Sequence, residues 1–283
     1  MFEIIKSAIF GVVEGITEWL PVSSTGHLIL VEEYLHLDKS EAFMNMFRVV
    51  IQLGAIMAVV VMFWKKLWPF GKKNNAQPFK PNGFGAYVKA DIFSMWFKVV
   101  VACLPAAVIG IFFDDWIDKH LYNSWTVAIA LIVFGIAFIV IENWNKGKEP
   151  KVNSINDLTY KAVLIIGLFQ LIAAIFPGTS RSGATIIGAL LIGISRTVAA
   201  EFTFYLAVPV MFGASLLKLV TFDSKFTGNE IAVLLTGTIV SFVVSIFVIK
   251  FLMDYIKKHD FKIFGWYRII LGTLVILYFS FIK

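Results

Sequence analysis

The chain has a single cysteine, Cys103, among 283 residues, and only 16% of its residues are charged. One cysteine excludes an internal disulfide and a cysteine-based metal cluster. The low charge accompanies a hydrophobic fraction of 59%, which lies far above that of a soluble domain. The composition therefore indicates a polytopic membrane protein, in which Cys103 fills space in an apolar helix.

Two further absences concern the N-terminus and the distribution of charge. The first apolar stretch has no basic n-region followed by a small-residue cleavage site, and it carries Glu14 and Glu18, so we expect no cleavable signal peptide. The net charge of +6 comes mainly from lysines between the apolar stretches. Membrane topology explains those lysines, and we expect no nucleic-acid partner.

Six stretches are long and apolar enough to cross a bilayer, for which a helix needs about 20 residues. They are 47–64, 92–113, 125–144, 202–220, 231–249 and 266–282. Lysine is concentrated in alternate loops: six lie in 65–91, and four each in 145–161 and 250–265. Because loops rich in Lys and Arg face the cytoplasm, these three loops are predicted to be cytoplasmic.

This orientation leaves two apolar segments that must enter and leave the membrane on the same side. Residues 1–35 are predicted to form a re-entrant hairpin from outside, and 162–195 another from the cytoplasm. Each hairpin is followed by three spans, so the second half is inverted relative to the first. We predict an all-α polytopic fold with six transmembrane helices and two re-entrant hairpins in one membrane domain, 1–283. Its inverted repeats are 1–144 and 162–283, and they place the functional site near the bilayer midplane.

The two hairpins carry similar polar segments. Residues 14–27 read EGITEWLPVSSTGH, and residues 170–183 read QLIAAIFPGTSRSG. A shift of 156 positions places Gly11 on Gly167, Glu14 on Gln170, Pro21 on Pro177, Ser23 on Thr179 and Ser24 on Ser180. Polar breaks in membrane helices are tolerated only where they are buried in protein or line a watery cavity.

The first segment combines acidic, hydroxyl and imidazole groups. Glu14 and Glu18 share one helix face, so a proton, a bound cation or a nearby arginine must relieve their repulsion. Ser23, Ser24 and Thr25 follow the break and suit the start of a second half-helix, where Ser23 and Thr25 are candidate phosphate-binding residues. Ser24 and His27 are three residues apart, which predicts an imidazole within reach of a hydroxyl, the pattern of an activated nucleophile.

The second segment is predicted to be a phosphate cradle. Thr179, Ser180 and Ser182 flank Arg181 where a helix should begin, and helix N-termini bind anions through free N–H groups. The arginine fork matches phosphate oxygens. A diphosphate there would make the site strongly anionic, so we expect a divalent cation, Mg²⁺ or Ca²⁺, held by Glu14 and Glu18.

Simpler explanations exist for each feature taken alone. A Ser/Thr-rich break can be a kink, His27 can be structural, and Arg181 can pair with a carboxylate merely to hold the halves together. Gln52, Glu201 and Arg48, which are polar within or beside the spans, are kept as candidates for supporting roles. Two matched tips that together hold Glu, Ser, His and Arg favour a functional origin.

Residues 14–27 and the motif PGTSRSG at 177–183 resemble the undecaprenyl-diphosphate phosphatase family, the integral-membrane type linked to bacitracin resistance. The resemblance covers nearly the whole chain, and departures such as Trp19 and Thr179 are small. It implies removal of the terminal phosphate from a polyprenyl diphosphate, which recycles the lipid carrier for peptidoglycan synthesis. It also implies a divalent cation, and a bacterial inner-membrane location with an extracytoplasmic active site.

The resemblance also assigns roles to residues. Glu14 and Glu18 would be the acidic pair beside Ser24 and His27, and Arg181 would bind phosphate with Ser180 and Ser182. Ser24, His27 and water all remain open as the nucleophile. The expected partners are the lipid substrate and membrane lipids, with a homodimer as a candidate assembly. The alternative function is a polyprenyl-lipid flippase or secondary transporter on the same scaffold, which would not need the Ser–His–Glu–Arg grouping. A structural scaffold would leave the buried carboxylates unexplained.

Overall fold

The computed structural model describes residues 2–71, 77–80, 83–121, 123–222 and 226–281, and its regular elements over these ranges are helices. Lys72, Lys73 and Lys225, three of the lysines used to predict topology, lie outside the described residues.

Within the described residues, six helices are long and apolar enough to cross a membrane, as predicted from the sequence. They are α3 (Glu41–Met62), α5 (Ala90–Leu121), α6 (Ser124–Asn145), α9 (Arg196–Val220), α10 (Gly228–Ile256) and α11 (Lys262–Phe281). Four of these six begin at a side-chain cap: oxygen atoms of the Ser40, Asn123, Ser195 and Thr227 side chains each accept a hydrogen bond from a backbone N–H in the first turn. The sequence therefore sets both the apolar length of these helices and where several of them start.

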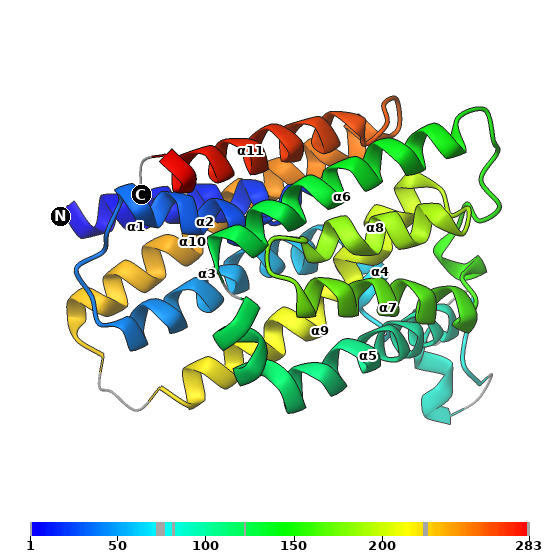
Figure 1. The fold of residues 1–283 in the computed structure, drawn as a ribbon. Coiled ribbons are helices and arrows are strands. Elements are labelled where there is room, and N and C mark those ends of the chain that lie inside the picture. The colour runs from blue at the N-terminus through cyan, green and yellow to red at the C-terminus, as the bar shows by residue number, and fades with distance from the viewer. Residues whose placement is uncertain (1, 72–76, 81–82, 122, 223–225, 282–283) are drawn as a thin grey trace.

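Four shorter helices form two hairpins. The first joins α1 (Phe2–Thr17) to α2 (Ser24–Tyr34), and the second joins α7 (Tyr160–Ile175) to α8 (Arg181–Leu191). Figure 1 shows the two hairpins entering the bundle from opposite ends, the first from the end where both chain termini lie. The remaining short elements are α4 (Trp64–Leu67), η1 (Gly83–Tyr87) and η2 (Ile155–Asp157).

The outer surfaces of the long helices are apolar, as a membrane protein requires. On α6, the side chains of Ile129, Val133, Ile136 and Val140 recur every three or four residues and are each about half exposed. This spacing places them on one helix face, which in a soluble protein would be polar. The face is suited to contact with lipid chains.

The hairpins are held by matching contacts with long helices. Helix α1 packs on α10, and α7 packs on α5. Each contact depends on a glycine: a Cβ on Gly11 would lie 2.5 Å from the carbonyl oxygen of Gly237, and a Cβ on Gly167 would lie 2.4 Å from that of Ala102. Gly11 and Gly167 are equivalent under the predicted 156-residue shift. Each allows its hairpin helix to pack closely against the backbone of a neighbouring long helix.

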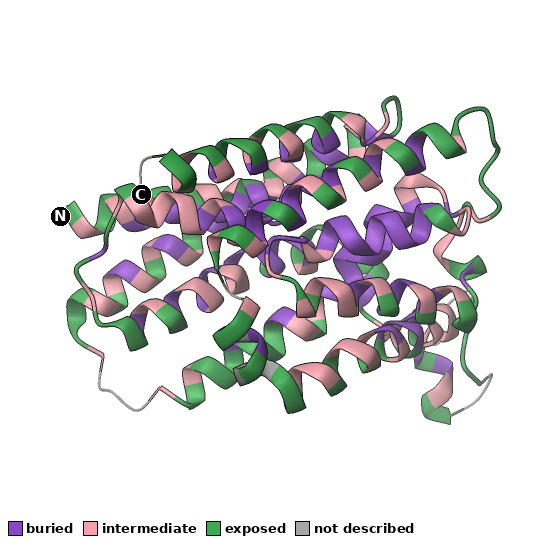
Figure 2. Cartoon of the chain, viewed as in Figure 1, coloured by how far each residue is buried: buried purple, intermediate pink, exposed green. Residues whose placement is uncertain are grey.

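Burial is greatest where the hairpin tips meet the middle of the bundle. Figure 2 shows buried residues along nearly the whole of α8 and in the centre of the molecule, while the peripheral helices are exposed on one side. Trp19, in the first tip, is fully buried and its ring packs edge-on against Phe204 of α9, with centroids 5.2 Å apart. The polar tips are therefore enclosed by protein.

Candidate functional site

The two hairpin tips adopt the same strained turn. Ser23 and Ser180 have φ angles of 75° and 70°, and among the described residues they are the two non-glycine residues with positive φ. Each precedes a helix, and its Oγ accepts a hydrogen bond from the backbone N–H of Gly26 or Gly183, respectively. Such a backbone costs about 1–3 kcal/mol per residue and persists only where the surroundings impose it. Both tips are therefore built to fix the start of the helix that follows.

This shared turn corrects the register predicted for the tips. Ser23 matches Ser180, a shift of 157 positions, so the predicted match of Ser24 with Ser180 is wrong. The second tip has one extra residue after its proline. With the corrected register, Ser24 and Arg181 are equivalent: each is the first residue of the helix after the turn.

These two equivalent residues bind the same carboxylate. The Ser24 hydroxyl donates to Oε2 of Glu18 at 2.7 Å, and Nη2 of Arg181 donates to Oε1 of Glu18, also at 2.7 Å. The Ser182 hydroxyl reaches the backbone oxygen of Glu18 at 3.3 Å. Glu18 therefore joins the two hairpins: the arginine of the second tip lies against the acidic segment of the first.

Glu14 lies one helical turn before Glu18 and has a very different environment. Its side chain is fully buried, and neither carboxylate oxygen has a hydrogen-bond partner. The charged groups that act on it are Glu18 and Arg181. Gln170, at the equivalent place in the other hairpin, is also buried with both amide atoms unpartnered. An unpartnered buried carboxylate is costly unless a proton or a bound cation relieves its charge.

Glu14 and Glu18 fit the predicted divalent cation in a limited way. Among the described residues there is no group of three or more His, Cys, Asp or Glu side chains that could share a metal ion. Two carboxylates agree with Mg²⁺, which is often held by one or two carboxylates and completes its shell with water and substrate phosphate. Within the described residues, protein side chains alone therefore do not supply a complete set of metal ligands.

His27 does not pair with Ser24, so that prediction from the sequence is wrong. Nδ1 of His27 lies 2.7 Å from the backbone oxygen of Ser23, and Nε2 lies 2.6 Å from the hydroxyl of Tyr267 in α11. A carbonyl oxygen only accepts, so Nδ1 carries a proton, and in the neutral ring Nε2 accepts from Tyr267. The His27 and Tyr267 rings are also parallel, with centroids 5.6 Å apart.

Arg268, also in α11, is a central residue that the sequence reasoning missed. Its side chain is fully buried, and its guanidinium donates to backbone oxygens of both tips: Pro21 at 3.1 Å, Gly178 at 3.0 Å and Thr179 at 2.8 Å. It also approaches the oxygens of Ala130 and Leu131 at 3.4 Å. The sequence did hold a signal for Arg268, because it lies inside a predicted span and ionisable residues at such depth are functional candidates.

Arg268 also changes the charge count of the site. Counted at formal charges, Glu14 and Glu18 give two negative charges, and Arg181 and Arg268 give two positive charges. The formal charges of these four residues therefore sum to zero. The diphosphate expected from the sequence would add its own negative charge, which a bound cation could offset.

Support for Arg181 comes from α9. Its Nη1 donates to the backbone oxygen of Thr203 at 3.3 Å, and its Nη2 lies 3.3 Å from the sulfur of Met211. Thr185, one turn further along α8, bonds to the backbone oxygen of Arg181 and to the hydroxyl of Thr203. Thr185 and Thr203 were not predicted, although both are hydroxyl residues inside apolar stretches.

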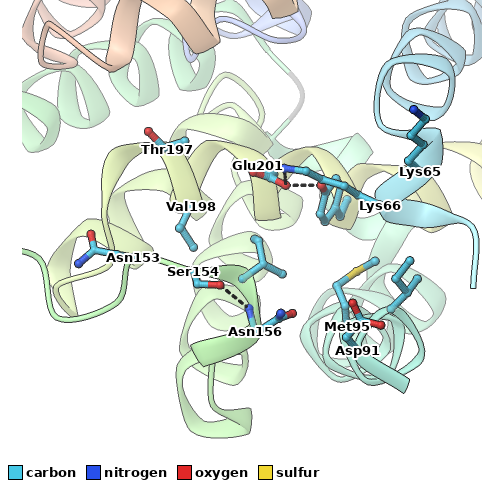
Figure 3. Close-up of a pocket in the computed structure, with 13 residues that line it drawn as sticks. Lys65, Lys66, Asp91, Met95, Asn153, Ser154, Asn156, Thr197, Val198 and Glu201 are labelled. Atoms are coloured by element: carbon cyan, nitrogen blue, oxygen red, sulfur yellow. Dashed lines mark hydrogen bonds and ion pairs between the residues drawn. The ribbon is translucent and has the colours of Figure 1, made fainter. Parts of the chain in front are cut away.

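The other predicted phosphate-binding residues lie at the same two tips. The hydroxyls of Ser180 and Ser182 are 3.1 Å apart, Thr179 is fully buried, and Thr25 lies in the first turn of α2. The supporting candidates lie elsewhere. Arg48 binds Glu32, and Glu201 binds Lys66 and Tyr205. Figure 3 shows Glu201 and Lys66 in a separate hollow of about 370 Å³, whose lining includes none of the residues predicted to be catalytic, to bind phosphate or to hold a metal.

The fold and this site together define a polytopic membrane protein with a buried acid–hydroxyl–guanidinium centre suited to phosphate chemistry. The family model described as bacitracin resistance protein BacA matches residues 7–274, and the chain belongs to this family.

Full-length relatives agree with the family assignment. A protein of Desulfitobacterium hafniense named undecaprenyl-diphosphatase is 61% identical over 280 residues, covering 99% of this chain and 97% of the relative. Undecaprenyl-diphosphatase 1 of Clostridium acetobutylicum is 60% identical, covering 98% and 97%. An undecaprenyl-diphosphatase of Enterococcus faecalis is 59% identical, covering 97% and 96%.

Proposed function

We propose that this protein hydrolyses undecaprenyl diphosphate to undecaprenyl phosphate and inorganic phosphate. The product is the lipid carrier reused in peptidoglycan synthesis, and removal of the diphosphate form would confer bacitracin resistance. The observation that carries the proposal is the Glu18 carboxylate, which binds the Ser24 hydroxyl on one oxygen and the Arg181 guanidinium on the other. A hydroxyl with a proton acceptor lies there beside a phosphate-binding fork.

The geometry favours Ser24 as the nucleophile, with Glu18 as its proton acceptor. Ser24 Oγ would form a bond to the terminal phosphorus while the bond from that phosphorus to the bridging oxygen breaks. Undecaprenyl phosphate leaves, and the serine proton passes to Glu18. Water then hydrolyses the phosphoserine, which releases phosphate and restores the hydroxyl. His27 is engaged by Ser23 and Tyr267, which supports a positioning role.

Phosphate binding would fall to the second hairpin. Arg181 can turn its fork toward phosphate oxygens, and the N-termini of α2 and α8 add backbone N–H groups to the same centre. Glu14 and Glu18 would hold Mg²⁺ or Ca²⁺. When bound, the metal would neutralise negative charge on the phosphates.

We further propose that the site opens to the extracytoplasmic side of the bacterial inner membrane. The loops rich in lysine lie at the end of the bundle from which the second hairpin enters, and the first hairpin enters from the other end. This arrangement supports inverted repeats at 1–144 and 162–283. The homodimer stays a prediction.

Phosphate release from undecaprenyl diphosphate by the purified protein in detergent tests the function. Detergent abolishes the two membrane sides, so a flippase or transporter would release no phosphate, whereas the proposed enzyme releases it and stops when a chelator is added. Acid-quench trapping should place a phosphoryl group on Ser24. A label on His27, or no label, would overturn the serine assignment.

Arg181→Ala should reduce turnover by at least about a hundredfold, as loss of a transition-state donor does. The matched control is Arg196→Ala, which removes another arginine–carboxylate pair, with Glu142, outside the site. Turnover that falls equally in both folded variants would contradict the role of Arg181.

A further inference from the structure

A hollow of about 540 Å³ lies at the end of the bundle from which the second hairpin enters (Figure 1). Its wall comes from the end of α6 and the loop after it, the turn between α8 and α9, and the end of α10. The charged members of the lining are four cations and two acids: Lys148, Lys151, Arg196, Lys257, Glu142 and Glu149. Their formal charge is therefore positive, and we call this site the basic hollow.

One carboxylate of the basic hollow is already bonded within the protein. Glu142 is 2% exposed, and its Oε1 and Oε2 accept hydrogen bonds from Nε and Nη2 of Arg196 at 2.9 and 2.5 Å. The backbone N–H of Phe261 also donates to Oε1, at 3.0 Å. Glu142 and Arg196 offset each other's charge, which leaves three lysines against Glu149 in the lining.

The three lysines differ in their contacts. Lys257 donates to Asp254 at 2.9 Å, and both side chains are exposed. Within the described residues, Lys148 and Lys151 form no ion pair. The Nζ of Lys148 instead lies 4.0 Å from the centre of the Trp144 ring. Lys148 and Lys151 therefore present positive charge that the protein itself does not neutralise.

Backbone hydrogen bonds hold Lys151 beside the N-terminus of α9. The N–H of Lys151 donates to the oxygen of Gly193 at 2.7 Å, and the N–H of Ser195 donates to the oxygen of Val152 at 2.9 Å. A Cβ on Gly193 would lie 3.3 Å from Cγ and Cδ of Lys151, so the lysine stem crosses the turn between α8 and α9. Ser195 caps α9, and the first backbone N–H groups of a helix have no partner within it. Lysine and a helix N-terminus together favour a phosphate group.

Part of the lining is apolar and exposed. Trp144 and Leu191 line the basic hollow and are 65% and 52% exposed. Trp144 lies near the end of α6, one of the six helices that are long and apolar enough to cross a membrane, and tryptophan is frequent at the boundary between membrane and water. These side chains suit a ligand that has apolar chains beside its charged group. A free phosphate ion would leave them uncovered.

We propose that the basic hollow binds the head group of an anionic phospholipid. The lipid phosphate would contact Lys148, Lys151 and the first N–H groups of α9, and the fatty-acid chains would lie against Trp144 and Leu191. Basic pockets between membrane helices on the cytoplasmic side bind anionic head groups in this way. The site is independent of the proposed phosphatase activity, and only its assignment to the cytoplasmic leaflet rests on the proposed orientation.

Titration of the purified protein with phosphatidylglycerol in detergent, followed by native mass spectrometry, tests the site. The double variant Lys148→Gln/Lys151→Gln removes two charges from the basic hollow. Its matched control, Lys161→Gln/Lys250→Gln, removes two exposed lysines at the same end of the bundle that do not line the hollow. Each lysine in the hollow should contribute about fivefold to affinity, so the dissociation constant should rise about 25-fold in the first variant and less than about twofold in the control.

Two further measurements keep the test independent of the variants. Phosphatidylcholine, whose head group has no net charge, should bind the wild-type protein at least about tenfold more weakly than phosphatidylglycerol. A bound lipid raises the unfolding temperature by mass action, and salt at about 1 M, where the Debye length is about 3 Å, should remove most of the rise caused by phosphatidylglycerol. Equal affinity for the two lipids, or a rise that salt does not change, would contradict an electrostatic head-group site.

Other results would overturn the assignment through the variants or through a competitor. One is a folded Lys148→Gln/Lys151→Gln protein that binds phosphatidylglycerol as tightly as the wild type. Another is an equal loss of affinity in the control, which would indicate an effect of net charge alone. Displacement of the lipid by inorganic phosphate at a concentration close to the dissociation constant of the lipid would indicate a site for a free anion. Phosphate release from undecaprenyl diphosphate without added phospholipid should be the same in both variants and the wild type, so failure of the proposed function would leave these binding results unaffected.

Discussion

Replacing Glu14 with glutamine should make the protein more stable and inactive. Glu14 is fully buried with two unpartnered carboxylate oxygens, and Gln170 is the residue that the other hairpin has at the equivalent place. Glu14→Gln therefore keeps the size of the side chain and removes its charge. The second hairpin already shows that a glutamine is accommodated there.

The magnitude follows from the cost of an isolated buried charge. Moving one ion out of water costs several kcal/mol in real proteins, and attraction to Arg181 offsets only part of this because Arg181 bonds directly to Glu18. The amide remains unpartnered, which retains part of the penalty. We expect Glu14→Gln to raise the free energy of unfolding by about 1–3 kcal/mol in the presence of chelator. Loss of the cation ligand should lower turnover by at least about a hundredfold.

The assay is thermal or chemical unfolding in detergent with chelator, paired with phosphate release from undecaprenyl diphosphate with added metal. Two matched variants carry the reverse expectation. Glu18→Gln weakens the bonds to Ser24 and Arg181, so it should destabilise the protein by about 1–3 kcal/mol. Gln170→Glu adds a second unpartnered carboxylate and should also destabilise it.

Two results would refute this reasoning. One is a Glu14→Gln protein that is less stable than the wild type in chelator, which would mean that the carboxylate has a stabilising partner. The other is turnover within about tenfold of the wild type, which would remove Glu14 from the site.

Further predictions concern the tips and their supports. Arg268→Lys keeps the charge but cannot reach both tips, so kcat should fall by about a hundredfold with a smaller change in the KM, measured by steady-state phosphate release; wild-type kcat would contradict a positioning role. Tyr267→Phe removes one hydrogen bond to His27 and should cost about 0.5–1.5 kcal/mol in unfolding free energy with less than tenfold loss of turnover. Gly167→Ala should lower the unfolding free energy by about 1–3 kcal/mol, whereas Gly228→Ala should not. Metal titration should show tighter Mg²⁺ binding with undecaprenyl phosphate present, and equal affinity without it would count against the charge balance.

Much of the fold could be predicted because it depends on few properties of the chain. Helix length and apolarity identified all six spans among the described residues, although some predicted bounds miss the observed helix ends by six to eight residues. The lysine distribution alone predicts that the two hairpins enter from opposite ends. These signals are strong because a bilayer penalises every exception to them.

The details of the site could not be predicted in the same way. The tip register depends on a positive φ at Ser23 and Ser180, and sequence identity favoured aligning Ser24 with Ser180 instead. The Ser24–His27 pair was inferred from spacing alone. Spacing does not reveal that the His27 ring bonds to the backbone oxygen of Ser23, one helical turn earlier. It also does not reveal that the Ser24 hydroxyl donates to Glu18. Backbone groups and residues from distant helices decide both contacts.

The corrected register explains how two similar hairpins can make one asymmetric centre. At the first position of the helix after the turn, one hairpin has a hydroxyl and the other a guanidinium, and both bind Glu18. In the helix before the turn, one hairpin has Glu14 and the other has Gln170 at the equivalent position. The polar atoms of both side chains are buried without a hydrogen-bond partner. Only the carboxylate can hold a cation by charge. A matched backbone therefore supplies the geometry, and two substitutions at equivalent positions separate the proposed nucleophile and metal side of the site from its proposed phosphate-binding side.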